Sequence, residues 1–221
     1  MNSIVFDSSS IISISEKCFI KVLEKLSQKA ELAIPKKVEF ESITRPSHIK
    51  AFELNALRIQ TALSQGWIKS IQLEPEFLQL SLRVKETANS CFFINNRPFV
   101  LIQDGEAETL ALLRQLDAST LVIDERNTRM LIEDIQGLHS YLQARIAGIM
   151  KNEQKIAELK KMLSGIKVCR SSELIAWAFE KGILESELQK NKESLEAALY
   201  AVKYSGCAVS EREINDYLGN F

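Results

Sequence analysis

The chain has 221 residues, of which 46% are hydrophobic and 26% charged, and its 28 basic and 29 acidic residues leave a formal net charge of −1. This is the composition of a globular protein that can bury a sizeable core, so it excludes disordered and collagen-like chains. The near-zero net charge also excludes a histone-like basic protein. Any nucleic-acid surface must therefore be a local patch.

The cysteines and the start of the chain indicate the compartment. There are two histidines and four cysteines, and no two cysteines form a Cys-x-x-Cys pair. This pattern argues against a structural zinc site or a Cys/His protease and favours buried free thiols in a reducing compartment. The opening MNSIVFDSSS has no basic segment and predicts no signal peptide, and no run approaches the roughly 18 apolar residues of a membrane span. We expect a cytoplasmic protein.

Apolar runs and helical spacings alternate along the first part of the chain. Strands are predicted at 3–6, 32–34, 67–73, 99–102, 120–123 and 166–169. Helices are predicted at 16–29, 36–43, 47–64, 75–89, 105–116 and 125–136, and the chain after 139 is mostly helical. This alternation predicts an α/β fold with a mainly parallel sheet flanked by helices. We expect a core at 1–136, an inserted basic helical segment at 137–165, and a last strand with C-terminal helices at 166–221.

Two aspartates follow predicted strands directly. Asp7 follows the run at 4–6, and Asp124 follows the run at 121–123. Ligands of open parallel sheets bind beyond the carboxyl ends of the strands, so both aspartates stand where chemistry is expected. The alternative is that each aspartate only caps the next helix. Capping is the more frequent role for a single aspartate, but two at strand ends favour a shared site.

Glutamates in two predicted helices extend this acidic set. Glu41 lies three residues after Val38 and so borders the buried face of its helix. In the segment 104–108, Asp104 suits the N-cap. Glu106 falls at the edge of the apolar face and Glu108 roughly opposite it, although Leu112 and Leu116 widen the apolar surface. Carboxylates that share one crevice repel one another unless a cation binds them, and oxygen ligands favour Mg²⁺ or Mn²⁺.

These segments together resemble the PIN-domain nucleases. The stretch IVFDSS at 4–9 resembles the opening Asp-x-Ser/Thr motif of that family, and Glu41 matches its second acid. The stretch GEAE at 105–108 is similar to the third-acid motif of one VapC-like subgroup, and LVIDE at 121–125 with Arg129 matches the fourth acid and a nearby arginine. The segments at 170–174 and 178–184 are similar to the closing helices of that subgroup. The order and spacing of the motifs carry the resemblance.

The resemblance implies a metal-dependent endoribonuclease, often the toxin of a toxin–antitoxin pair. It implies that Asp7, Glu41, Glu106 and Asp124 hold one or two divalent ions. Ser9 would support the site by hydrogen bonds, and Arg129 would orient an acid or touch phosphate. The alternative is a non-catalytic RNA-binding or assembly module that keeps the fold.

The sequence departs from the family pattern at two places. About 30 residues separate the arginine-bearing helix from the last strand. The third acid is a glutamate where many relatives have an aspartate, which leaves Glu106 and Glu108 as competing candidates for that position. The inserted segment is basic, since the window 145–170 holds seven positive and two negative residues. We consider three roles for it: a packing helix, an RNA-binding arm or a dimer contact through its apolar stripe. The arm would use four lysines, Lys151, Lys155, Lys160 and Lys161.

Overall fold

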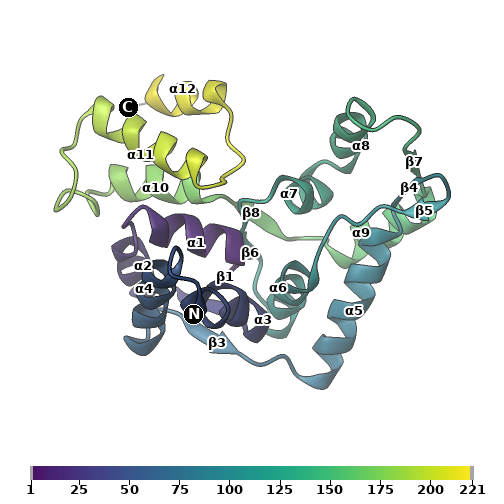
Figure 1. The fold of residues 1–221 in the computed structure, drawn as a ribbon, viewed down its shortest axis with the longest axis horizontal. Helices are drawn as coiled ribbons and strands as arrows, with labels where there is room; N and C mark the ends of the chain where they lie inside the picture. The colour runs from purple at the N-terminus through teal and green to yellow at the C-terminus, as the bar shows by residue number, and fades with distance from the viewer. Residues whose placement is uncertain (1, 220–221) are drawn as a thin grey trace.

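A five-stranded parallel sheet forms the centre of the molecule, as seen in the computed structural model, which describes residues 2–219. The strand order is β3-β2-β1-β6-β8, and every neighbouring pair is parallel. The strands are β1 (Ser3–Phe6), β2 (Glu31–Pro35), β3 (Lys69–Ile71), β6 (Thr120–Val122) and β8 (Lys167–Cys169). The predicted α/β fold with a mainly parallel sheet is confirmed (Figure 1).

Helices flank the sheet and continue beyond its last strand. Before β6 these are α1 (Ser8–Glu16), α2 (Lys21–Ser27), α3 (Lys36–Glu39), the π-helix η1 (Phe40–Thr44), the 3₁₀-helix η2 (Pro46–His48), α4 (Glu53–Ser64), α5 (Pro75–Asn89) and α6 (Asp104–Gln115). After β6 they are α7 (Arg126–Glu133), α8 (Ile135–Gln143), α9 (Glu153–Met162), α10 (Ser171–Glu180), α11 (Lys192–Tyr204) and α12 (Glu211–Gly219). Within residues 2–219, no helix has both the length and the apolar character to cross a membrane.

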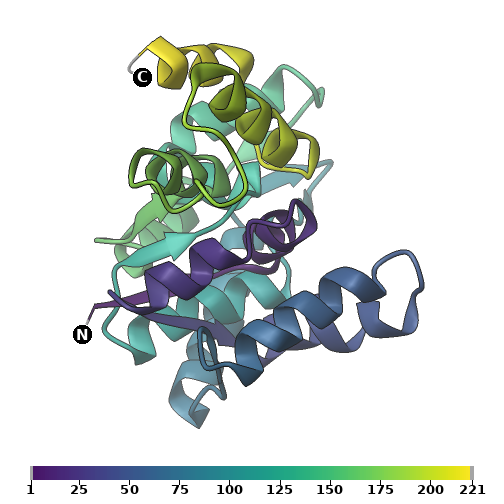
Figure 2. The same ribbon diagram turned by 90° about the vertical axis from the view of Figure 1, so that its left-hand side faces the viewer.

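The sheet separates two hydrophobic cores, because successive strand residues point to opposite faces. Phe6 and Val122 join the core that α1, α2, α4 and the C-terminal helices build on one face. Val5, Leu121 and Ile123 join the core that α5 to α9 build on the other face. Figure 2 shows that the C-terminal helices and α4 lie at opposite ends of the helices that build the first of these cores. This alternation decides the side on which each strand-end acid lies.

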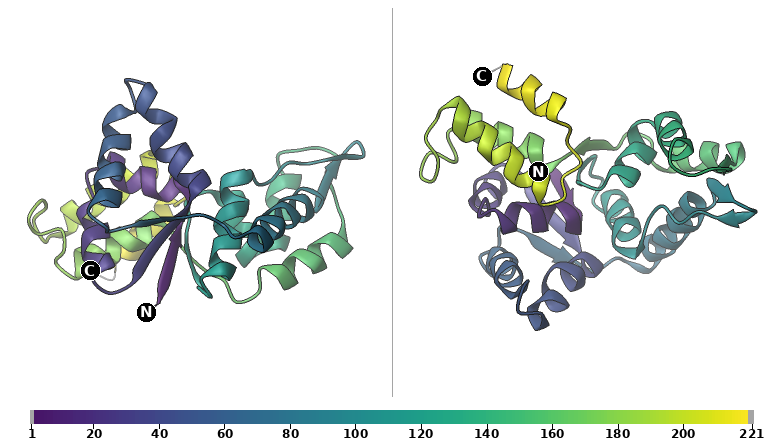
Figure 3. Two further views of the ribbon diagram at one scale, coloured as in Figure 1. Left: turned by 90° about the horizontal axis from the view of Figure 1, so that it is seen from below. Right: turned by 45° about the horizontal axis from the view of Figure 1, so that its top comes forward.

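A second lobe projects from the sheet (Figure 3). It combines α5, α8 and α9 with a small antiparallel sheet of β4 (Phe92–Ile94), β5 (Arg97–Pro98) and β7 (Met150–Lys151), in the order β5-β4-β7. The turn between β4 and β5 is Asn95-Asn96, both with positive φ, as a tight hairpin turn requires. The strand predicted at 99–102 is therefore wrong, and the pairing partners lie earlier in the chain.

The apolar stripe of the 137–165 segment packs inside this lobe. Five of its residues are buried in the second core: Leu142, Ile149, Ile156, Leu159 and Leu163. The stripe is therefore occupied within the chain and is not the exposed dimer surface that the sequence analysis considered.

Local hydrogen bonding explains where other predicted helices differ. The single helix predicted at 16–29 is two helices, because Asp7 caps a helix at Ser8 and Cys18 takes a positive φ that ends it. The helix predicted at 125–136 breaks at Asp134, whose carboxylate caps α8 through the Gly137 amide. The N-cap of α6 is Gln103 rather than Asp104, because Gln103 and Glu106 form a capping box.

Arg170 ties the C-terminal helices together. Its buried guanidinium pairs with Glu173 on α10 (2.6 Å) and Glu213 on α12 (2.7 Å), and it donates to the Ala208 carbonyl (3.0 Å). Burial raises the pKa of Glu213, but hydrogen bonds from Ser210 and the charge of Arg170 outweigh burial and lower the pKa to about 2. The pair therefore stays charged at neutral pH.

Candidate active site

An acidic pocket opens at the carboxyl edge of the sheet. Its volume is about 320 Å³, and its lining includes Asp7, Glu41, Glu106 and Glu125 together with Ser8, Ser9, Gln103 and Gly105. These residues come from the ends of β1 and β6 and from the first turns of α1, η1, α6 and α7. Figure 1 shows these elements meeting in the middle of the molecule. This is the edge at which parallel α/β sheets bind ligands.

Strand alternation selects which strand-end acids reach the pocket. Asp7 follows Phe6 and so lies on the same side of the sheet as Val5, which faces α6. Asp124 falls on the opposite side, and Glu125 returns to the side of Asp7. The fourth carboxylate of the pocket is therefore Glu125, whereas the sequence analysis expected Asp124.

Asp7 is 2% exposed and is held by Ser9. Its Oδ2 accepts hydrogen bonds from the Ser9 amide (3.0 Å) and the Ser9 hydroxyl (2.7 Å). Its Oδ1 is buried and has no hydrogen-bond partner among the described residues. Burial raises the pKa of Asp7, the bonds from Ser9 lower it, and the charge of Asp124 raises it further, with a net increase. A buried, unpartnered carboxylate oxygen beside a pocket is a ready ligand for a cation.

Glu41 enters the pocket from the π-helix η1. π-helices are rare and frequently mark functional positions, because the wider turn redirects side chains. The Glu41 carboxylate lies against Gly105 so closely that a Cβ at position 105 would collide with it. Burial raises the pKa of Glu41, and the neighbouring charge of Asp7 raises it further. Glycine at 105 therefore leaves the space that this carboxylate occupies.

Glu106 is fixed by two hydrogen bonds from different elements. One oxygen accepts from the Gln103 amide (2.7 Å), and the other accepts from the Thr128 hydroxyl on α7. Burial raises the pKa of Glu106 to about 7, with further contributions from the charges of Asp7 and Glu125. Thr128 also donates its amide to Glu125 (2.7 Å), whose pKa burial raises as well. Thr128 thus links the two glutamates.

Asp124 is fully buried and is not part of the pocket lining, although its charge acts on Asp7. One of its carboxylate oxygens accepts from the Ser171 amide (2.7 Å), and the other accepts from the Ser171 hydroxyl (2.7 Å). Its own amide donates to the Ser9 hydroxyl (3.1 Å), the same hydroxyl that holds Asp7. Asp124 therefore connects the end of β6 to α10 and to the support of Asp7.

Two other predicted residues lie outside the pocket. Glu108 lines a separate pocket of about 200 Å³ with Lys37, Lys85 and Asp104, so Glu106 is the one of the two glutamates that joins the acids. Arg129 pairs with Glu133 (3.1 Å) on its own helix, and its Nε is buried with no hydrogen-bond partner among residues 2–219.

The four lysines of the 137–165 segment differ in their surroundings. Lys151 pairs with Glu153 (2.6 Å), and Lys155 pairs with Glu158 (3.0 Å). Lys160 and Lys161 are exposed near the end of α9, and neither has an ion pair in the described part of the chain. Two of the four charges are thus already balanced by neighbouring glutamates.

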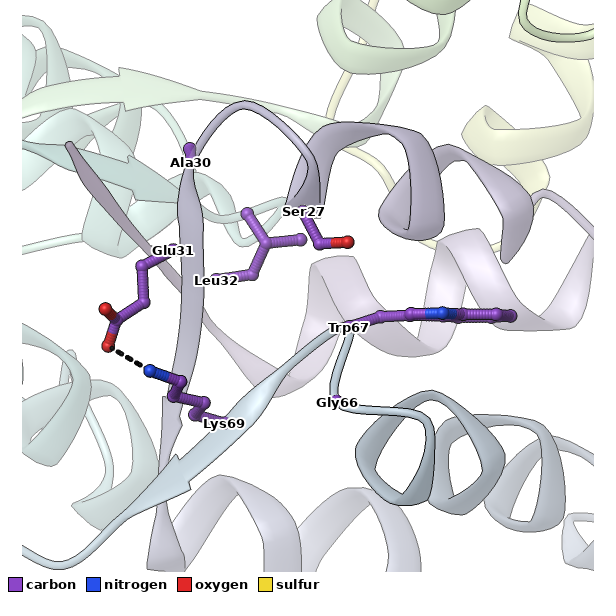
Figure 4. Close-up of a pocket in the computed structure, with 7 residues that line it drawn as sticks. All are labelled: Ser27, Ala30, Glu31, Leu32, Gly66, Trp67 and Lys69. Carbon is purple, nitrogen blue, oxygen red and sulfur yellow. Dashed lines mark ion pairs between the residues drawn. The ribbon is translucent and has the colours of Figure 1, made fainter. Parts of the chain in front are cut away.

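A pocket at the opposite edge of the sheet provides a comparison (Figure 4). It has a volume of about 110 Å³ and is lined by residues before and at the starts of β2 and β3, among them Trp67 and the ion pair of Lys69 with Glu31 (3.4 Å). Its one carboxylate is neutralised by that lysine. Of these two pockets, only the one at the carboxyl edge is lined by acids without a basic residue to neutralise them.

The donor set of the acidic pocket fits a divalent cation. Within residues 2–219, no three histidine, cysteine, aspartate or glutamate side chains stand together as a ready-made metal site. The unpartnered Oδ1 of Asp7 nevertheless shares its pocket with three glutamates, and all four groups have raised pKa values. Burial is the main cause of each increase, and repulsion between the acids adds to it. A bound cation would stabilise the charged carboxylates, and hard oxygen ligands suit Mg²⁺ or Mn²⁺.

Glu125 and Thr128 were not predicted from the sequence. The signal for Glu125 was the two-residue period of β6, because Ile123 and Glu125 share a side with Val5 and Asp7. Thr128 carried no signal, since it lies 22 residues after Glu106 in the sequence and on a different helix.

A family model described as a PIN domain matches residues 3–169, which is more than half of the chain. The chain therefore belongs to the PIN-domain family, as the motifs predicted. Members of this family are generally nucleases, and they typically use divalent metals. No curated protein and no solved structure matches the chain. The matched range ends at β8 and leaves the C-terminal helices outside it.

Proposed function

We propose that the protein is an endoribonuclease that hydrolyses RNA phosphodiester bonds with Mg²⁺ or Mn²⁺ at the acidic pocket. One observation carries the proposal: Asp7, whose Oδ1 is buried and has no hydrogen-bond partner among the described residues, lines a pocket together with three glutamates. A pocket so rich in carboxylates has no counter-charge of its own, and family membership supports a nuclease.

In this proposal Asp7, Glu41, Glu106 and Glu125 hold the ion. A divalent ion bound to carboxylates supplies a Lewis acid that activates water and stabilises the leaving oxygen. Ser9 keeps Oδ2 of Asp7 occupied and so leaves Oδ1 available to a cation. Thr128 and Gln103 hold Glu106 in place. Asp124 contributes indirectly, because its amide donates a hydrogen bond to the Ser9 hydroxyl that holds Asp7.

We further propose that the protein is the toxin of a toxin–antitoxin pair and works in the cytoplasm. The motif resemblance supports the toxin role. All four cysteines are free thiols, which fits a reducing compartment. Burial raises the pKa of Cys91 and Cys169 to about 12 and that of Cys207 to about 11, so these three thiols stay protonated.

Asp7→Asn tests the catalytic proposal. Purified protein should cut RNA with Mn²⁺ or Mg²⁺ and stop with EDTA, and Asp7→Asn should reduce cutting to background. The melting temperature should stay similar or rise, because asparagine can still cap α1 and the repulsion among the acids falls. Asp117→Asn is the matched control, since Asp117 is exposed just before β6, at the other end of that strand.

Titration with Mn²⁺ separates the enzyme from a non-catalytic module. The wild type should bind the ion, and Asp7→Asn should bind it much more weakly. RNA binding without metal binding or cleavage would favour the module, and unchanged cleavage by Asp7→Asn would place the activity elsewhere.

A further inference from the structure

Two arginines converge on one tyrosine beside the acidic pocket. Arg126 is the first residue of α7 and directly follows Glu125, which lines the pocket. Its guanidinium lies 5.0 Å from the ring centroid of Tyr141 on α8, and the guanidinium of Arg145 lies 3.7 Å from the same centroid. Arg145 also donates to the Tyr141 carbonyl (3.2 Å). We call these three residues the arginine–tyrosine cluster.

The two arginines are not balanced by acids. Among the described residues, no carboxylate forms an ion pair with Arg126 or Arg145. By contrast, four basic residues on α3, α5 and α7 are paired: Lys37 and Lys85 with Asp104, Lys36 with Glu39, and Arg129 with Glu133. Arg126 is half-buried and Arg145 is exposed, so both guanidinium groups keep unused donors.

A polyanionic substrate needs such charges at this place. The pocket lining contains four carboxylates and no basic side chain, so it repels a phosphate backbone until that charge is offset. Guanidinium groups bind phosphate oxygens through paired hydrogen bonds, which an ammonium group cannot match in geometry. An aromatic ring under each guanidinium limits its motion and leaves its edge free for an anion.

We propose that the arginine–tyrosine cluster binds the sugar–phosphate backbone of the RNA next to the bond that is cleaved, with Arg126 and Arg145 on phosphates and Tyr141 holding both side chains. This inference rests on the proposed function, because it assigns the substrate path of the same pocket. The RNA strand then leaves the pocket over α7 and α8, which lie side by side in Figure 1.

RNA binding in EDTA tests the cluster without requiring cleavage. The probe is a short fluorescein-labelled oligouridylate, and its anisotropy is measured at several salt concentrations. Arg126→Gln with Arg145→Gln should weaken binding by roughly tenfold or more. The slope of log affinity against log salt should become shallower by about 1.4, because each phosphate contact on a single strand contributes about 0.7.

Two further variants keep the result specific. Tyr141→Leu retains both charges but removes the ring, so affinity should fall while the salt slope stays the same. Lys160→Gln with Lys161→Gln removes two exposed, unpaired charges from α9 and should leave affinity unchanged. Circular dichroism and the melting temperature verify that each variant is folded.

Several outcomes would overturn the proposal. RNA affinity unaffected by the double arginine change would remove the cluster from the substrate path. An equal loss in the double lysine variant would assign binding to general surface charge or to the α9 arm. Unchanged RNA binding with lost binding of a polyglutamate peptide would assign the cluster to an acidic protein segment. If the wild type does not cleave RNA in the Asp7 experiment, each of these binding results can still be interpreted, because the assay in EDTA does not require cleavage.

Discussion

At the scale of single residues, Gly105 controls the position of Glu41. Gly105 lies in the first turn of α6 without a positive φ, so its backbone accepts any residue. Gly105→Ala should cost no stability, and helix propensity favours alanine by up to about 1 kcal/mol. Its Cβ would nevertheless displace the Glu41 carboxylate from the pocket. We therefore expect lower cleavage and weaker Mn²⁺ binding at an unchanged or higher melting temperature.

Gly66→Ala is a control with the opposite pattern. Gly66 has a φ of +74°, so alanine at this position strains the backbone and lowers stability. A Cβ added there would have no atom within 4 Å, so the acidic pocket stays intact. Equal cleavage by wild type and Gly105→Ala would show that the Glu41 carboxylate has no fixed place in the reaction.

Most of the candidate site could be predicted from residue patterns. The remainder depended on the face of the sheet toward which a side chain points. Asp7, Glu41 and Glu106 were identified by their places after strands and on helix faces, and the structure puts all three in one pocket. Asp124 and Glu125 are neighbours in the sequence, so position alone could not separate them. The separation comes from the pairing of β6 with β1, which decides the face toward which each side chain points.

At the scale of elements, two adjacent acids after β6 accept hydrogen bonds from two different helices: Asp124 from α10 and Glu125 from α7. Glu125→Gln should abolish Mn²⁺ binding with little change in stability, since glutamine can still accept the Thr128 amide. Asp124→Ala should lower the free energy of unfolding by about 1.5–3 kcal/mol, because it leaves the buried Ser171 amide and hydroxyl without their charged acceptor. Metal titration and chemical denaturation measure the two effects. A reversed pattern would restore Asp124 as the fourth pocket ligand.

The elements were predicted best where apolar spacing was regular. The helix predicted at 75–89 coincides with α5, and strands were predicted within a few residues of β1, β2, β6 and β8. The serine-rich α1 was missed because its polar residues are buried: Ser10 and Ser13 donate to backbone carbonyls rather than to water. The small sheet was missed because β5 and β7 each have two residues, too few for a periodic pattern.

At the scale of the whole molecule, the pocket makes stability depend on pH. Burial raises the pKa of Glu106 from 4.5 to about 7, so the folded state binds a proton that the unfolded state has released over this interval. The metal-free protein should therefore lose stability as pH rises from about 4.5 to 7, by up to about 3 kcal/mol. Glu213 acts in the opposite direction, because its pKa is lowered from 4.5 to about 2 in the folded state. Its contribution to stability is lost only as pH falls below about 4.5.

Denaturation of the metal-free protein across this range measures the effect. Glu106→Gln should flatten the pH dependence, and saturating Mn²⁺ should remove most of it, because an ion that binds only the folded state offsets the repulsion. Stability that rises between about pH 5 and 7 in the wild type would mean that groups outside the pocket govern the titration.

The order in which the chain is synthesised gives β8 a special importance. All four pocket carboxylates lie within residues 7–125, but the strand that covers the free edge of β6 begins at Lys167, and Ser171 follows it. A growing chain on the ribosome thus carries every metal ligand of the proposed nuclease before β6 has its second neighbour. Until then β6 is an exposed edge, and the Asp124 carboxylate lacks the two hydrogen bonds that the Ser171 amide and hydroxyl donate to it. The four carboxylates are therefore synthesised before β8 and α10, the two elements that complete the sheet edge and the support of Asp124.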